Sequence, residues 1–166
     1  MNLIVAVDEN WNIGYKNDLL EKISADLKNF KRLTLNSTVI MGRNTFDSLP
    51  GKKALPKRIN IVLSRDKNLH IPNVIICNTI QEALHKISDS DQDKVFVIGG
   101  ETIYKHFLPY CEKAYITKIF NKYIADKKMI NLDLLSEWKI IEKSEIFEND
   151  NGIKFQYITY KRLETN

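Results

Sequence analysis

Short apolar runs alternate with helix-like segments through most of the chain. Runs rich in β-branched and aromatic residues predict strands at about 2–8, 38–42, 59–64, 73–77, 94–98, 113–119, 138–147 and 153–161. Apolar residues three and four positions apart predict helices at about 24–35, 44–49, 79–88 and 100–107. Because these helices fall between strands, the pattern predicts right-handed βαβ crossovers and a largely parallel sheet.

The last part of the chain follows a different pattern. The stretch IFENDNGIKFQY places an Asn-Asp-Asn-Gly turn between two strands of alternating polarity, which is typical of an antiparallel hairpin at the edge of a sheet. Neither a repeat nor a Pro/Gly-rich linker divides the sequence. We therefore expect one α/β domain over residues 1–166, with a mixed sheet, about four flanking helices and ligands at the carboxyl ends of the strands.

Composition and charge exclude several classes of protein. A chain of 166 residues with 43% hydrophobic and 28% charged residues is typical of a soluble domain with its own core. The net charge of +4 is scattered rather than clustered, which disfavours nucleic-acid binding. No segment predicts a signal peptide or a membrane span. Cys77 and Cys111 form no CxxC motif, so we expect a reduced, cytoplasmic protein.

Metal binding is not expected from the histidines. His70, His85 and His106 show no spacing with Cys, Asp or Glu that is typical of a metal site. They are interpreted as surface or structural residues.

Asp26, in the stretch EKISADLKNFKRL, is the first candidate for chemistry. With Ser24 as the expected N-cap, Asp26 lies in the first turn of a helix. At 100° per residue it falls inside the apolar stripe formed by Ile23, Leu27, Phe30 and Leu33. One interpretation is an acid that stabilises the positive end of the helix. The other is a buried carboxyl that needs a ligand with N–H donors, because an unpaired charge in such a stripe is unfavourable.

Three predicted strand ends carry candidate anion contacts. VIMGRNTFDSLP ends a strand at Gly42 and begins a helix at Arg43, while INIVLSRD brings Ser64 and Arg65 to a strand end. Free N–H groups at a helix start and guanidinium groups both suit phosphates. Each arginine alone is expected to be solvated, but the three ends lie on one side of the sheet and together predict a phosphate site. Neither G-x-G-x-x-G nor a Walker A motif is present.

The third strand end is the stretch VFVIGGETIY, in which a buried strand ends in Gly99 and Gly100. Two adjacent glycines indicate backbone geometry that a Cβ would block, or a ligand that lies against the main chain.

Six stretches in order resemble the bacterial-type dihydrofolate reductases. They are IGYKNDLL, ADLKNFKRLTLN, VIMGRNTFDSLPG, LPKRINIVLSRD, VFVIGGETIYKHFLP and AYITKI. The resemblance implies a mixed eight-stranded sheet and the reduction of 7,8-dihydrofolate to tetrahydrofolate by NADPH, which supplies one-carbon metabolism. We further expect a monomer that binds neither nucleic acid, membrane nor metal.

The resemblance assigns roles to individual residues. Asp26, backed by Thr117, is the catalytic acid that hydrogen-bonds the pterin ring. The substrate-binding set is Val5, Ala6, Asp26, Leu27, Phe30, Leu49, Arg58, Ile98 and Thr117, in which Arg58 pairs with the carboxylate of the glutamate tail. The cofactor-binding set is Ala6, Ile13, Gly14, Leu19, Gly42, Arg43, Asn44, Thr45, Leu63, Ser64, Arg65, Ile98, Gly99, Gly100, Glu101, Thr102, Ile103 and Tyr104. The resemblance further implies a cis peptide between the paired glycines.

The chemistry needs a proton as well as a hydride. Hydride reaches C6 of the pterin only if N5 is protonated, and we infer that Asp26 favours that protonated state while water delivers the proton.

The chain departs from the family pattern in three places. Leu20-Glu21 replaces the usual Pro-Trp pair, Thr102 stands where an arginine is frequent, and the segment 126–130 lacks the usual Asp-Thr-x-Phe-Pro. We expect Glu21 to turn outward into solvent, since exposure is usual for a loop glutamate. The alternative is a second acid that relays the proton.

Two other functions are compatible with parts of the sequence. A reductase of the riboflavin-biosynthesis type would share the cofactor edge but has no reason to combine Asp26 with Arg58. A non-catalytic module that binds anions or nucleic acid would need a basic face with interleaved aromatic residues, which this chain scatters.

Overall fold

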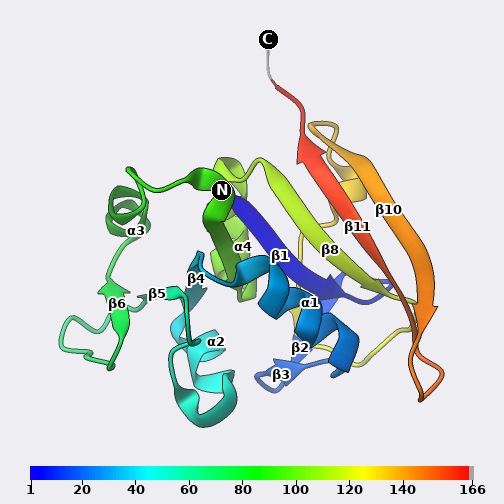
Figure 1. The fold of residues 1–166 in the computed structure, drawn as a ribbon, viewed down its shortest axis with the longest axis horizontal. Coiled ribbons are helices and arrows are strands. Elements are labelled where there is room, and N and C mark those ends of the chain that lie inside the picture. Colours follow the sequence, from blue (N-terminus) through cyan, green and yellow to red (C-terminus); the bar gives the residue numbers. More distant parts are fainter. Residues whose placement is uncertain (165–166) are drawn as a thin grey trace.

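The computed structural model describes residues 1–164, which fold around a mixed eight-stranded sheet (Figure 1). Its strands are β1 (Asn2–Val7), β4 (Thr38–Gly42), β5 (Ile59–Leu63), β6 (Val74–Cys77), β7 (Val95–Gly99), β8 (Lys113–Ile119), β10 (Trp138–Glu148) and β11 (Lys154–Arg162). They lie in the order β10-β11-β8-β1-β7-β4-β5-β6. The pairs from β8 to β6 are parallel, and β11 is antiparallel to both β8 and β10. The predicted fold class is confirmed, including the C-terminal hairpin.

Four α-helices connect the strands, as predicted. They are α1 (Ser24–Thr34), α2 (Arg43–Ser48), α3 (Ile80–Lys86) and α4 (Glu101–Phe107). Short 3-10 turns, η1 (Pro50–Lys52), η2 (Gln92–Lys94), η3 (Leu108–Tyr110) and η4 (Leu132–Leu134), complete the connections. The expectation that Ser24 caps α1 is wrong: the cap position is Ile23, which is buried and makes no side-chain cap hydrogen bond.

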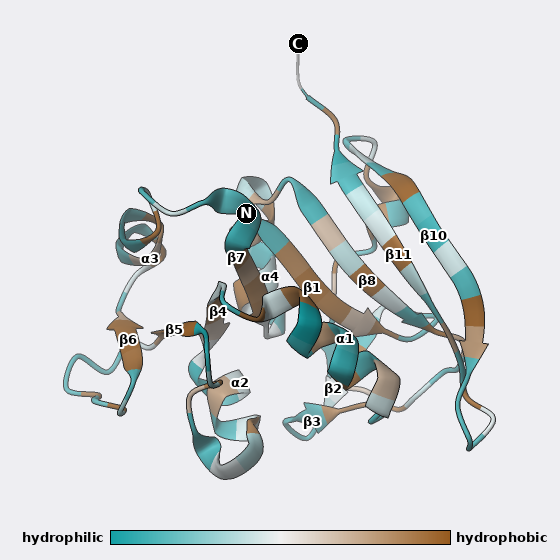
Figure 2. Cartoon of the chain, viewed as in Figure 1, coloured by the Kyte–Doolittle hydropathy of each residue, from teal (hydrophilic) through white to brown (hydrophobic). Residues whose placement is uncertain are grey.

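The core lies on both faces of the sheet, because side chains alternate along each strand. On β1, Leu3 and Val5 join the large cluster that contains Phe107 of α4, while Ile4 joins a second cluster against which Phe30 of α1 packs. Helices α1 and α4 therefore cover opposite faces. Figure 2 shows that β1 is hydrophobic along most of its length, as expected for a strand buried on both faces.

A second, three-stranded sheet was not predicted. It consists of β3 (Asp18–Leu19), β2 (Asn12–Tyr15) and β9 (Lys127–Lys128), in that order. Between β2 and β3, Lys16 and Asn17 have positive φ values of 48° and 60°, which suits a tight hairpin turn. Two of its strands have only two residues each, so no periodicity could reveal them.

Candidate active site

The half-buried carboxyl of Asp26 and the buried hydroxyl of Thr117 meet between α1 and β8. Thr117 Oγ1 donates a hydrogen bond of 2.6 Å to Asp26 Oδ1. Burial raises the pKa of Asp26, and the hydrogen bond from Thr117 opposes that rise. Within residues 1–164 no lysine or arginine forms an ion pair with Asp26. The carboxyl is thus poised to accept hydrogen bonds from a buried donor.

A small cavity of about 30 Å³ lies beside Asp26. Apart from Asp26 and Glu21, its lining is apolar and consists of Ala6, Ile13, Leu19, Leu20, Ile23, Leu27 and Ile119. Leu27 was expected to face the core, but it is 48% exposed and edges the cavity. The structure therefore brings Ala6 and Leu27 from the predicted substrate set together with Ile13 and Leu19 from the predicted cofactor set.

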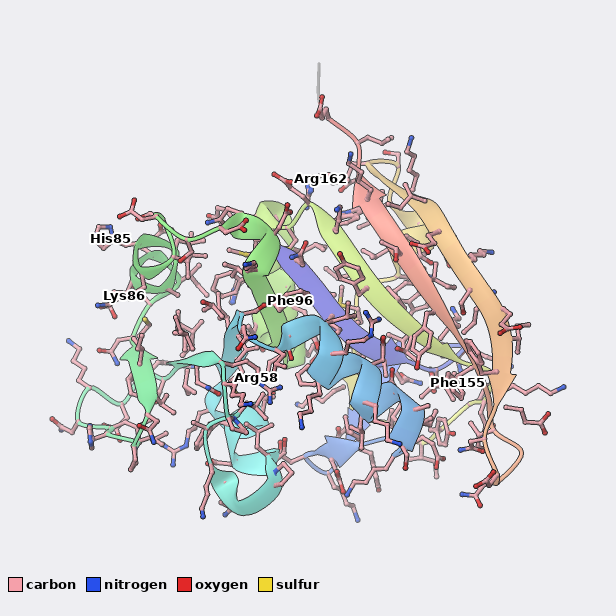
Figure 3. The ribbon with its side chains drawn as sticks, viewed as in Figure 1. Arg58, His85, Lys86, Phe96, Phe155 and Arg162 are labelled. Carbon is pink, nitrogen blue, oxygen red and sulfur yellow. The ribbon has the colours of Figure 1, made fainter. Side chains whose placement is uncertain are left out.

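Arg58 lies at the opposite end of α1 from Asp26. Its Nη1 donates 3.1 Å to Thr34 Oγ1, and its Nε donates 2.9 Å to the Pro56 carbonyl; Figure 3 shows it beside the C-terminal end of α1. Eight residues of helix separate Asp26 from Thr34, or about 12 Å. A carboxyl near the start of α1 and a guanidinium near its end suit an elongated ligand with a donor-bearing ring at one end and an anion at the other.

The remaining predicted substrate residues are divided between the two cores. Phe30, Leu49 and Ile98 pack against the cluster on the α1 face. Val5 belongs to the cluster on the α4 face and does not line the cavity near Asp26.

The carboxyl ends of three parallel strands meet at one edge of the sheet. Gly42 of β4 pairs in register with Leu63 of β5, and Met41 with Gly99 of β7. The Gly99–Gly100 peptide bond is cis, as predicted. A Cβ added to either glycine would lie 3.4 Å from Thr45 Oγ1. The bare backbone here leaves room for a ligand against the main chain.

Charged and hydroxyl groups surround this edge. Arg43 Nε bonds both carboxylate oxygens of Asp47 at 3.1 Å, whereas Arg65 is exposed and makes no ion pair within residues 1–164. Ser64 Oγ accepts 3.2 Å from the Asp66 amide. Two guanidinium groups, two hydroxyls and a glycine backbone fit the phosphates and flat rings of a dinucleotide.

The other predicted cofactor residues differ in exposure and partners. Asn44 and Thr102 are exposed, and Gly14 lies in β2. Ile103 packs close to Gly42, and Glu101 Oε1 accepts 3.0 Å from the Lys128 amide. Tyr104 is buried, and its hydroxyl donates 2.8 Å to the Ile4 carbonyl.

Comparison with known proteins agrees with this geometry. The family model described as dihydrofolate reductase matches residues 1–162. A dihydrofolate reductase of Buchnera aphidicola (subsp. Baizongia pistaciae) is 37% identical over 164 residues, covering 99% of this chain and 97% of the relative. One from Staphylococcus haemolyticus is 36% identical over 166 residues, with coverage of 98% and 96%.

The chain belongs to the dihydrofolate reductase family. A solved dihydrofolate reductase from Enterococcus faecalis, complexed with NADP(H) and RAB-propyl, superposes with a TM-score of 0.88 at 29% identity, covering 98% of this chain and 96% of that one. The chain is accordingly an NADPH-dependent oxidoreductase that acts on dihydrofolate. Nothing in these comparisons favours the riboflavin-biosynthesis type.

The departures from the dihydrofolate reductase pattern have clear structural outcomes. Glu21 is half-buried, and its Oε2 accepts 2.9 Å from the Tyr123 hydroxyl. The expectation that Glu21 turns outward is therefore wrong: its carboxylate has a partner inside the protein. The altered segment near 126 still packs, since β9 pairs with β2 and buried Met129 donates 2.8 Å from its amide to the Trp11 carbonyl.

Asp8, which the sequence analysis did not single out, organises the loops beside the cavity. It accepts hydrogen bonds from the amides of Asn10, Asn12 and Tyr123 and from the Asn12 side chain, at 2.9 to 3.0 Å. Burial acts to raise the pKa of Asp8, but these hydrogen bonds outweigh it and hold the pKa below its usual range. The sequence pattern that could have indicated this turn is Asp8, Asn10 and Asn12 directly after the first strand, since Asp and Asn side chains organise turns.

Thr117 lines a second, larger cavity of about 290 Å³. Its lining includes Asn29 and Arg32 of α1, Tyr115 of β8, Ser144 of β10 and Tyr157 of β11. Asp26 does not line it, so the smaller cavity is the one that holds the candidate chemistry.

Proposed function

We propose that Asp26 and Thr117 form the catalytic centre at which this chain reduces 7,8-dihydrofolate to tetrahydrofolate. The observation that carries the proposal is the 2.6 Å hydrogen bond from Thr117 to a half-buried carboxyl that forms no ion pair and lines a mostly apolar cavity. A carboxyl in this state gains most from a ligand with N–H donors, because such a ligand replaces the lost water.

The substrate would lie along α1. Its pterin ring would meet Asp26, with Ala6 and Leu27 beside it, and its benzoyl part would contact the apolar side chains of Phe30 and Leu49. Arg58 would pair with a carboxylate of the tail, since a planar guanidinium suits bidentate pairing. The spacing of about 12 Å between the two ends supports this orientation.

NADPH supplies the hydride when it is bound. Gly99 and Gly100 would let it approach the backbone, and Thr45, Ser64, Arg43 and Arg65 would contact its phosphates. The hydrophobic lining from Ile13 and Leu19 would exclude water from the reacting atoms. Asp26 would hold the pterin so that N5 takes up a proton from water before C6 receives the hydride.

We further propose that residues 1–166 work as one domain and as a cytoplasmic monomer that binds no nucleic acid. Two buried free cysteines and scattered positive charge support this reading. No helix among residues 1–164 is long and apolar enough to cross a membrane.

The test is the loss of the NADPH near-ultraviolet absorbance on addition of dihydrofolate. We expect dihydrofolate-dependent oxidation with the purified chain. Oxidation at the same rate without dihydrofolate, or none at all, would remove the proposed function.

A further inference from the structure

Glu21 and Asp26 are the two acidic residues that line the small cavity. The remaining lining is apolar; outside it, Thr117 donates a hydrogen bond to Asp26 and Tyr123 donates one to Glu21. Like charges that line one cavity repel each other, and a cation between them would relieve that repulsion. The arrangement therefore favours a ligand that carries positive charge inside the cavity.

Tyr123 holds Glu21 in this position. Its hydroxyl donates 2.9 Å to Glu21 Oε2, although the two residues lie 102 positions apart. Burial raises the pKa of Tyr123, as does the neighbouring Glu21, so the phenol keeps its proton and acts as the donor. The Tyr123 amide in turn donates 3.0 Å to Asp8, which fixes the loop that carries Tyr123.

The other charges around Glu21 do not neutralise it. Lys22 is exposed and forms its ion pair with Asp18 at 3.5 Å, away from the cavity. Asp8 accepts a hydrogen bond from the Tyr123 amide, and Asp26 lines the same cavity as Glu21. Within residues 1–164, no lysine or arginine forms an ion pair with Glu21.

We propose that Glu21, positioned by Tyr123, is a second carboxylate of the substrate cavity that favours the N5-protonated form of bound dihydrofolate. This inference rests on the proposed function, and it assigns to Glu21 an electrostatic role that complements the hydrogen bonds of Asp26. N5 takes its proton from water, and Glu21 neither gains nor loses one in the step. Its effect is to extend hydride transfer to higher pH.

The first test is the pH profile of single-turnover hydride transfer in Glu21→Gln. Removing the Glu21 charge from the cavity is expected to lower the apparent pKa of hydride transfer by about half a unit to one unit. The variant should match the wild type near pH 6 and be about threefold to tenfold slower near pH 9. Glu9→Gln, an exposed carboxylate that lines neither cavity, is the matched control and should follow the wild-type profile.

The second test measures binding rather than turnover. Proton uptake on dihydrofolate binding, measured by calorimetry in buffers of different ionisation enthalpy, should be smaller for Glu21→Gln than for the wild type at neutral pH. Unchanged uptake together with a rate that falls by one factor at every pH would overturn the proposal and leave Glu21 as a packing residue.

The third test asks whether Tyr123 acts through Glu21. Tyr123→Phe should shift the profile in the same direction but by less, and it should have no further effect in the Glu21→Gln background. Tyr110→Phe, on an exposed tyrosine, is the control. Equal effects of Tyr123→Phe in both backgrounds would contradict the positioning role. A wild-type chain without dihydrofolate-dependent activity would instead refute the proposed function, which keeps the two failures distinct.

Discussion

The carboxyl of Asp26 is half-buried and hydrogen-bonded to Thr117 on a strand far away in sequence, whereas Arg65, just after the end of β5, lies in solvent. Burial raises the pKa of Asp26, and the hydrogen bond from Thr117 opposes that rise. The exposed Arg65 leaves a charge free to meet an anion. Because we propose chemistry at the first end of the site and cofactor binding at the second, substitutions at the two ends should affect different kinetic constants.

The largest effect is expected at the substrate end. Asp26→Asn keeps the shape and an acceptor for Thr117 but removes the charge, so single-turnover hydride transfer should slow by roughly 10²–10⁴, the usual contribution of a positioned acid–base group. Asp89→Asn, on an exposed carboxylate, is the matched control. A loss below tenfold in Asp26→Asn would remove this carboxyl from the chemistry.

The next effect concerns the choice of cofactor. Arg65→Ala should reduce the preference for NADPH over NADH by about tenfold to a hundredfold, the contribution of one charge-assisted contact. Arg43→Ala should lose less, because Asp47 already holds Arg43. Steady-state kinetics with both cofactors measure this, with Lys67→Ala as a neighbouring exposed control. Equal losses with NADH and NADPH would exclude both arginines from the 2′-phosphate.

A smaller effect is expected at Thr117, which donates a hydrogen bond to the Asp26 carboxyl. Thr117→Val removes the donor of the 2.6 Å hydrogen bond, which should raise the pKa of Asp26 further and slow hydride transfer by about tenfold. Thr159→Val, on the neighbouring strand β11, controls for the loss of a hydroxyl. An unchanged rate and pH profile for Thr117→Val would show that the hydroxyl does not act on Asp26.

The smallest effect concerns stability. Because burial raises the pKa of Asp26 in the folded state, the folded protein binds more protons than the unfolded one between the two pKa values, and stability falls as pH rises through that window. Asp26→Asn lacks this penalty, so its Tm should exceed that of the wild type at neutral pH. The difference should shrink as pH falls below the pKa of unfolded Asp, about 3.9. A lower Tm at neutral pH would contradict this sign.

Local patterns predicted most of the fold. The eight main strands and four helices follow from apolar runs and spacing, and the glycine pair marked the edge where three strands end. The sheet formed by β2, β3 and β9 escaped prediction because its pairing joins residues near 14 to residues near 127, and strands of two residues have no periodicity. Pairing over such a distance depends on tertiary structure.

The site was only partly predictable, because its hydrogen bonds also join residues that lie far apart in the sequence. Asp26 stood out as an acid in an apolar stripe, but its bond to Thr117 spans 91 positions and entered only through family resemblance. Glu21 was misjudged because exposure is the usual state of a loop glutamate, and its partner Tyr123 lies 102 positions away. The average exposure of a residue type cannot predict a hydrogen-bond partner that only the folded chain brings close.

The central claim is that the site around Asp26 favours dihydrofolate protonated at N5. The most direct test is the pH dependence of single-turnover hydride transfer in the wild-type protein, at saturating NADPH and dihydrofolate. We expect the rate to fall as pH rises from about 6 to about 9, with a kinetic isotope effect when deuteride is transferred. A rate that stays flat across that range, with the same isotope effect, would show that protonation at Asp26's end of the site does not control the reaction.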